Sequence, residues 1–144
     1  MAGFEKRDIL GMPGAVVDEY VCEEVLGWAR AAAARLGGAS IEETAWVETL
    51  GSSAVTRRDG TKTTAPRYGM VAVAGGTPDF ADAGEVVQIL EAMARAGYEL
   101  RFTWAEEAFR ASYATSPGDH GDATEIALPS APDALRRAAL LAVQ

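Results

Sequence analysis

The sequence has little of the side-chain chemistry that enzymes use most. Among its 144 residues there is one cysteine, Cys22, and one histidine, His120. A single cysteine excludes an internal disulfide and agrees with a reducing compartment, so we expect a cytoplasmic protein. A single histidine excludes a multi-histidine site within one chain. Because Asp119, His120 and Asp122 crowd one short loop and cannot form a cage unaided, the sequence predicts no metal site.

Long hydrophobic runs are also missing. No stretch of 18 or more apolar residues occurs, so no membrane-spanning helix is predicted, and the first residues lack the apolar core of a signal peptide. The hydrophobic fraction of 49% and charged fraction of 24% are typical of a globular domain. At 144 residues, one domain with a substantial core is the simplest expectation.

Catalytic patterns are absent as well. A serine or cysteine nucleophile needs a general base, His120 is the one imidazole, and no G-x-S-x-G or C-G-x-C context surrounds any candidate. The paired acids Glu23-Glu24, Glu42-Glu43 and Glu106-Glu107 are expected to face water. The sequence therefore predicts a protein that is not an enzyme and that carries no cofactor.

The charge is unevenly distributed. The formal net charge of −8 argues against a general nucleic-acid-binding surface, because phosphates would be repelled. The segment 56–67 nevertheless has four basic residues against one acid, a local charge of +3, which leaves −11 for the rest of the chain. This segment is either a binding site for a small anion or a solvated loop. Its basic residues are Arg57, Arg58, Lys62 and Arg67.

The amino-terminal part is predicted to start with a flexible arm over 1–14, because Gly11-Met12-Pro13-Gly14 interrupts regular structure. A helix is predicted over 15–36, since apolar residues recur there at helical spacing and two glycines follow. Cys22 is expected to be a small buried thiol on this helix. The apolar stripe consists of Val17, Val21, Val25, Trp28, Ala32 and Leu36.

The next segment, 41–77, has a weaker pattern. Residues 41–50 fit either a strand or a short helix. Two polar runs, 54–58 and 61–64, flank Asp59-Gly60, a pair that a type I′ turn prefers, so a hairpin is predicted. Residues 68–74 predict a short apolar strand.

The carboxyl-terminal part, 78–144, has the clearest pattern. Asp82 is expected to cap a helix that ends at Gly97, and two alternating runs, 98–104 and 109–115, predict a hairpin. Ser130 is expected to cap a closing helix. The predicted fold is α+β: an antiparallel sheet with helices packed on it, similar to an α-β-α sandwich, in a single domain over 15–144.

The predicted hairpin places two arginines on one face of the sheet. If Tyr98, Phe102 and Trp104 face the helices, Arg101 and Arg110 lie on the opposite face. Their guanidinium groups suit phosphate or carboxylate oxygens, although they could equally pair with Glu99 or with acids of another subunit.

Three motifs in order resemble a family of small phage and prophage proteins, the phage ABA-sandwich domain family. They are DEYVCEEVLGW at 18–28, PDFADAGEVV at 78–87 and APDALRRAAL at 131–140. The resemblance covers about half the chain and implies a helix–sheet–helix sandwich and a phage origin. Two features depart from the family pattern. The segment 41–77, which joins the first helix to the second motif, is longer than the family's connection and is therefore interpreted as an insertion, and Arg136 stands where the family commonly has a cysteine.

The resemblance also implies a function class. Phage proteins of similar size and build include oligomeric anti-defence sponges, which sequester cyclic nucleotide immune signals such as cyclic ADP-ribose in the bacterial cytoplasm. We therefore expect a homo-oligomeric binding protein whose ligand is a small anionic nucleotide. An acidic inhibitor of a host defence protein, or another phage accessory protein, is the alternative. The hypothetical ligand-binding residues are Arg57, Arg58, Lys62, Arg67, Tyr68, Arg101 and Arg110.

Overall fold

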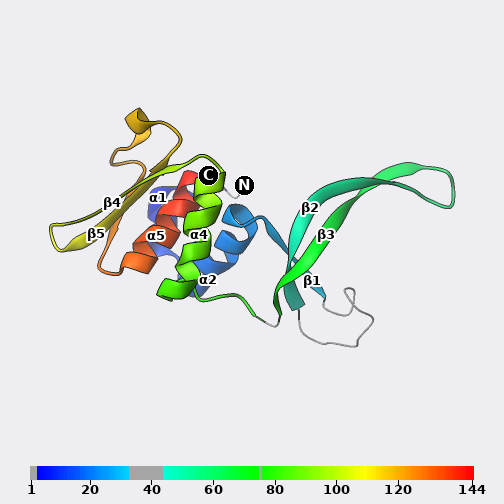
Figure 1. Ribbon diagram of the computed structural model, residues 1–144, viewed down its shortest axis with the longest axis horizontal. Coiled ribbons are helices and arrows are strands. Elements are labelled where there is room, and N and C mark those ends of the chain that lie inside the picture. The colour runs from blue at the N-terminus through cyan, green and yellow to red at the C-terminus, as the bar shows by residue number, and fades with distance from the viewer. Residues whose placement is uncertain (1–2, 33–43, 75) are drawn as a thin grey trace. The chain divides into compact units, whose positions relative to one another are not determined.

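A computed structural model describes residues 3–32, 44–74 and 76–144, with the backbone alone at 31–32, 44–45, 66, 68 and 70–74. The predicted α+β class is confirmed: the chain forms two three-stranded antiparallel sheets together with helices (Figure 1). Two compact units result, the first made of Met1–Leu26 and Thr77–Gln144 and the second of Gly27–Gly76. The second unit contains most of the predicted insertion, and each unit is described separately below.

The first unit begins with helices where a flexible arm was predicted. Helix α1 spans Lys6–Gly11, and a capping box between Glu5 and Asp8 satisfies its first backbone groups. Ile9 of α1 is completely buried, and its carbonyl accepts a hydrogen bond from the guanidinium of Arg137. The prediction of an arm was wrong because one buried side chain and one carbonyl contact hold this short helix to the core.

The long helix predicted over 15–36 is also wrong beyond residue 25. Helix α2 (Gly14–Tyr20) continues into a π-helical turn, η1 (Val21–Val25), and strand β1 (Trp28–Ala32) follows. Gly27 adopts a φ of +70°, which ends the helix, and the alanine-rich segment after it pairs with another strand. Long-range pairing therefore outweighs the helix propensity of alanine here. The part of the prediction over 33–36 lies outside the described residues.

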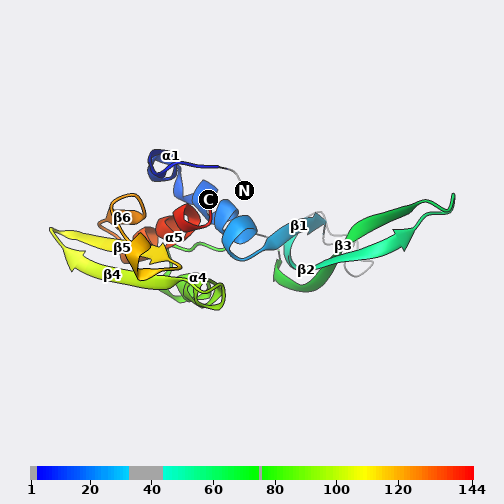
Figure 2. The same cartoon turned by 90° about the horizontal axis from the view of Figure 1, so that it is seen from above.

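The sheet of the first unit has the order β4-β5-β6 (Figure 2). The predicted hairpin is confirmed by β4 (Glu99–Ala105) and β5 (Ala108–Ala114), whose register is regular throughout. Strand β6 (Glu125–Leu128) was not predicted, because four residues are too few for a clear alternation. A short 3₁₀ turn, η2 (Pro117–Asp119), lies in the loop between β5 and β6.

Two helices complete the first unit. Helix α4 (Ala83–Arg95) begins as predicted, with the Asp82 carboxylate accepting from the backbone N–H of Gly84 at 2.8 Å. Helix α5 (Ala131–Ala142) packs on β5 and β6, and the other helices pack around it. All side chains from Ala134 to Leu140 are buried, so α5 lies at the centre of the unit. The predicted buried thiol of Cys22 is confirmed.

The second unit is a sheet of order β1-β2-β3, in which two long strands dominate. Strands β2 (Thr44–Thr56) and β3 (Lys62–Ala74) confirm the predicted hairpin and extend it. The predicted type I′ turn is wrong. Of the turn residues only Gly60 has a positive φ, +84°, and the Gly60 N–H bonds the Arg57 carbonyl at 2.9 Å. This pattern is a type I turn followed by a left-handed glycine. Its loop is one residue longer than the two-residue loop of a type I′ turn.

Candidate functional site

The turn of the β2–β3 hairpin is closed by local hydrogen bonds. The backbone N–H of Arg57 donates to the Thr61 carbonyl at 2.9 Å. The Asp59 carboxylate accepts from the Thr61 hydroxyl at 2.6 Å and from its N–H at 2.9 Å. Hydrogen bonds from the hydroxyl and then from the N–H lower the pKa of Asp59. The one acid of the turn is therefore engaged by its own neighbour.

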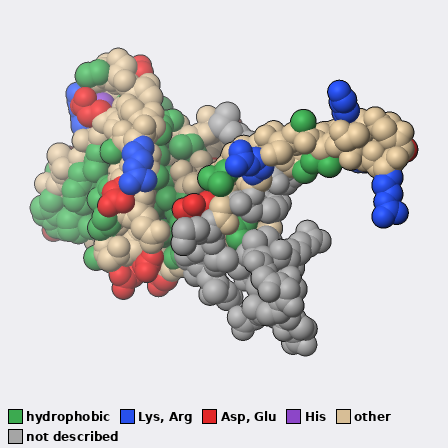
Figure 3. Space-filling view, turned by 45° about the vertical axis from the view of Figure 1, so that its right-hand side comes forward, with side chains coloured by type: hydrophobic (Ala, Val, Ile, Leu, Met, Phe, Trp, Pro, Cys, Tyr) green, Lys and Arg blue, Asp and Glu red, His purple; other side chains and the backbone are tan. Residues whose placement is uncertain are grey.

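The cations around this turn are exposed, and no acid in the described ranges pairs with them. Arg57, Arg58, Lys62 and Arg67 are all exposed, and Figure 3 shows basic side chains standing out from the hairpin. Within the described part of the chain, no acid lies within ion-pair distance of any of the four. Their positive charges are thus available to a ligand. Arg101, Arg110, Arg136 and Arg137, by contrast, lie beside acids, as the next paragraphs show.

The strand register separates these cations into two groups. Lys62 lies opposite Thr56 at the start of β3, one position from Arg57, and Arg58 lies in the turn itself. We call Arg57, Arg58 and Lys62 the tip cations. Arg67 is five residues along β3, or about 17 Å of strand. The side chain of Tyr68 lies outside the described set, and its backbone pairs with Thr49.

Arg101 and Arg110 belong to the first unit, apart from the tip cations. The Arg110 guanidinium pairs with Glu125 at 2.8 Å and with Glu106 at 2.9 Å. The hydrogen bond to Glu125 is the main cause that raises the pKa of Arg110. Arg101 is half-exposed and lies 4.0 Å from Glu99. Of the predicted alternative partners, Glu99 lies beside Arg101 at the limit of an ion pair, whereas Arg110 pairs with Glu106 and Glu125, which were not predicted.

A polar network on the outer face of the first sheet was not predicted. The Ser112 hydroxyl lies 2.8 Å from Nδ1 of His120 and 2.7 Å from the Thr124 hydroxyl, and Nε2 of His120 lies 3.7 Å from Glu99. The three residue types resemble a hydrolase triad, but Ser112 is only 4% exposed and cannot reach a substrate. The network instead fastens the loop before β6 to β5. The alternation of β5 places Ser112 on the face away from the helices. This was the one feature of the sequence that could have indicated a polar network there.

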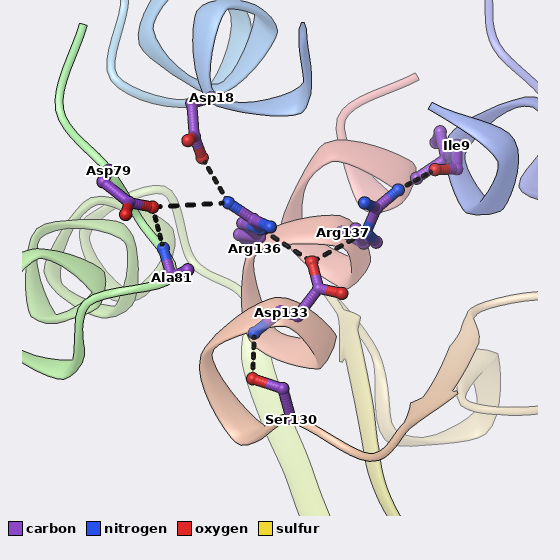
Figure 4. Close-up of polar contacts among 8 residues, drawn as sticks. All are labelled: Ile9, Asp18, Asp79, Ala81, Ser130, Asp133, Arg136 and Arg137. Atoms are coloured by element: carbon purple, nitrogen blue, oxygen red, sulfur yellow. Dashed lines mark hydrogen bonds and ion pairs between the residues drawn. The ribbon is translucent and has the colours of Figure 1, made fainter. Parts of the chain in front are cut away.

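A second unpredicted network surrounds two buried arginines of α5 (Figure 4). The Asp133 carboxylate accepts from Nε of Arg136 at 2.7 Å and from Nε of Arg137 at 2.8 Å. Arg136 also donates to Asp18 at 2.8 Å, and Asp79 lies 3.9 Å away. The sequence analysis predicted the closing helix and its cap but assigned no partner to these two arginines. Only the departure from the family pattern at Arg136 indicated a change in packing there.

Asp18, Asp79 and Arg136 of this network line a cleft of about 350 Å³. Burial raises the pKa of Asp18 more than the charge and hydrogen bond of Arg136 lower it. Burial alone would also raise the pKa of Asp133, but hydrogen bonds from Arg137 and Arg136 lower it. The arginine charge is thus already shared among carboxylates, which leaves no free charge for a ligand. The lining residues are Gly14, Ala15, Asp18, Glu19, Thr77, Pro78, Asp79 and Arg136.

Two classes of site have no basis in the described part of the chain. There, no group of three or more His, Cys, Asp or Glu side chains is placed to hold a metal ion. None of the described helices has the length and apolar character needed to cross a membrane.

No protein-family model, curated protein or solved structure matches the chain. The resemblance to the phage ABA-sandwich family therefore stays a prediction, and the geometry of the chain itself carries the functional argument.

Proposed function

We propose that this protein is a non-enzymatic binding protein whose hairpin tip holds an anionic ligand. The observation that carries the proposal is the set of exposed tip cations, beside which no described acid lies, whereas the arginines at 7, 95, 101, 110, 136 and 137 lie beside acids. Cations left unpaired on an acidic protein repel one another and stabilise nothing locally. A ligand with clustered negative charge would offset that repulsion.

The ligand class that we propose is a phosphate-bearing cyclic nucleotide. Arg57 and Arg58 present planar donor forks that fit two oxygens of one phosphate, and Lys62 adds a third charge. The specific form of the proposal is that the protein is a phage-encoded sponge, which removes a nucleotide immune signal from the host cytoplasm. Sequestration needs affinity without turnover, which agrees with a serine–histidine pair that is buried away from substrate.

A second function is favoured by the charge of the first unit. That unit has seventeen acidic and seven basic residues, a net charge of −10, whereas the hairpin unit has a net charge of +2. An acidic body of this kind would suit a protein inhibitor that docks on a basic host protein. The two proposals use different units, so separate variants test them.

The test of the first proposal is thermal unfolding with a panel of cyclic dinucleotides, cyclic trinucleotides and cyclic ADP-ribose isomers. At about 100 times its dissociation constant, a ligand stabilises the native state by roughly 2.7 kcal/mol, which raises the melting temperature measurably. Ligand released by denaturation should be recovered intact. The sponge is ruled out if no member of the panel raises the melting temperature, and converted ligand would show an enzyme.

The variants follow from the register. Neutralising the three tip cations together should abolish the shift, while Arg67→Ala, about 17 Å away along the strand, should weaken it less. Arg95→Ala is the matched control, because Arg95 is also exposed, on α4, and has only a loose ion pair of 3.8 Å. Equal losses for the control and the tip variant would show a non-specific charge effect.

A further inference from the structure

The first unit exposes aromatic side chains on one strand. Phe102 and Trp104 of β4 are 40% and 59% exposed, although their alternation predicted that both face the helices. They do lie on the helix-facing side of the sheet, but α5 packs on β5 and β6 and leaves this end of β4 uncovered. Phe109 contacts both rings, with centroids 5.7 Å and 4.6 Å away. Exposed clusters of this kind mark interaction surfaces more often than isolated apolar residues do.

The same strand has a free edge. In the order β4-β5-β6, β4 is an outer strand, and no described strand pairs with its outer side. Proteins usually protect such an edge with a proline, a bulge, an inward-pointing charge or a very short strand. Strand β4 has seven residues, a regular register and no proline, and Leu100, Phe102 and Trp104 are apolar on its inward side. Its unpaired backbone groups are therefore available to another strand.

We propose that β4 pairs antiparallel with β4 of a second copy of this chain, which joins two sheets into one of six strands. The sequence of β4 is complementary to itself when the two strands are centred on Leu100. Leu100 then faces Leu100, and Phe102 lies opposite Tyr98, the residue that precedes β4, on the apolar side, where large side chains pair favourably. Glu99 faces Arg101 on the polar side, and the two-fold symmetry repeats each pair.

Charge complementarity indicates that the strand pairing with the edge of β4 comes from a second copy of this chain. Glu99 and Arg101 are about half-exposed, and within one chain they approach each other only to 4.0 Å. In the symmetric pairing each meets an opposite charge directly across the strands, twice per dimer. Shifting the pairing by one position on each strand, to a centre on Arg101, would bring the two copies of this arginine face to face, so the charges disfavour that register.

Light scattering after size-exclusion chromatography gives the first test. The native protein should have twice the 15.1 kDa mass of the chain at micromolar concentration. Phe102→Lys places a charge on the apolar side of the edge and should weaken self-association roughly tenfold or more. Val87→Lys is the matched control, because Val87 is 45% exposed on α4 of the same unit, and it should leave the mass unchanged. Far-ultraviolet circular dichroism checks that each variant is folded.

A charge-swap series tests the register and the occupant together. Glu99→Arg alone, or Arg101→Glu alone, creates two like-charge pairs and should raise the dimer dissociation constant roughly tenfold. The double variant E99R/R101E restores both opposite-charge pairs and should recover the native value. If the edge of β4 instead paired with a strand of a different protein, the double variant would not recover the native dissociation constant.

Three results overturn the proposal: a monomeric native protein at all concentrations, a dimer that Phe102→Lys leaves intact, or a double swap that stays weak while both single changes weaken the dimer. Nucleotide binding by the tip cations uses the other unit. The dimer and the proposed function can therefore fail independently.

Discussion

At the scale of single residues, the feature with the largest free-energy cost is the burial of the charged side chains of Arg136 and Arg137. Their side chains are only 7% and 8% exposed, and buried charges are costly unless they are paired and hydrogen-bonded. Asp133 binds the Nε of both, whereas Asp18 contacts only Arg136. The two carboxylates therefore have different roles, which their pKa directions reflect.

Asp133→Asn should destabilise the protein, because the two charge-assisted hydrogen bonds of the carboxylate are lost or weakened. Each such bond contributes about 1.5–3 kcal/mol, so a loss of about 2–4 kcal/mol in the free energy of unfolding is expected. Asp18→Asn should change it by less than about 1 kcal/mol near pH 7, because the carboxylate is desolvated and an amide oxygen can still accept from Arg136. Urea unfolding of both variants measures the difference, and a larger loss for Asp18→Asn would contradict this account.

The pKa shifts of Asp133 and Asp18 predict opposite pH dependences of the free energy of unfolding. The pKa of Asp133 is below its ordinary value of 3.8, so its contribution is present above that pH and is lost as the pH falls through the folded pKa. The pKa of Asp18 is raised, so its contribution is present at low pH and is lost as the pH rises through the folded pKa. Relative to the native protein, Asp18→Asn should therefore gain stability from pH 4 upwards. Asp133→Asn should approach native stability only below pH 4, and parallel profiles would refute both assignments.

The β4–β5 turn predicts a stabilising substitution. Glu106 and Glu107 both adopt positive φ values, 54° and 61°, where residues other than glycine are strained by about 1–2 kcal/mol. Glu107→Gly should raise the free energy of unfolding by about 1 kcal/mol and leaves the ion pair of Glu106 with Arg110 intact. Ala105→Gly, one step inside the strand, should lower it instead. If both changes lower stability, the turn is not strained as described.

At the scale of elements, the sequence predicts best where local signals agree with the final contacts. Helix α4 has a cap at Asp82, a periodic apolar face and a glycine end, and all three are present in the structure. The β4–β5 hairpin has clear alternation on both strands. Where a local preference competes with a distant partner, as in the alanines after Gly27, the pattern alone gives the wrong element. That competition depends on β2, which no local window contains.

In the candidate site, too, local features could be predicted from the sequence, whereas contacts between distant residues could not. The tip cations and the position of their hairpin could be predicted, because Asp59-Gly60 marks the turn between two polar runs. The pairing of Arg110 with Glu125 could not, because the strand that carries Glu125 was not recognisable. The networks of Ser112 and Arg136 join residues far apart in sequence or on irregular loops, and periodicity has no information about them.

The turn also predicts a gain of binding. Asp59→Asn keeps an oxygen that accepts from Thr61 but removes the one negative charge among the tip cations. Anion affinity should rise about twofold to fivefold, the range expected for one exposed charge interaction. Asp122→Asn, in an exposed loop of the first unit, is the control and should have no effect. Weaker binding by Asp59→Asn would mean that the carboxylate itself contacts the ligand.

At the scale of the whole molecule, the two units carry opposite net charges, −10 and +2. Added salt screens the repulsion within the acidic unit and the attraction between the tip cations and an anion. Raising the salt concentration from about 10 mM to 100 mM shortens the screening length from about 30 Å to 10 Å. The melting temperature of the unliganded protein should therefore rise while ligand affinity falls. Affinity independent of salt would show that the tip cations do not bind the ligand through charge.

Isothermal titration of the best ligand from the nucleotide panel tests the central claim most directly. The native protein and Arg95→Ala should bind with equal affinity. The triple variant R57A/R58A/K62A should lose binding by about a hundredfold or more, as removal of three ion pairs of roughly 1 kcal/mol each implies. Its unliganded melting temperature should stay near native, because no described acid pairs with these cations. Undiminished binding by a folded triple variant would contradict the account.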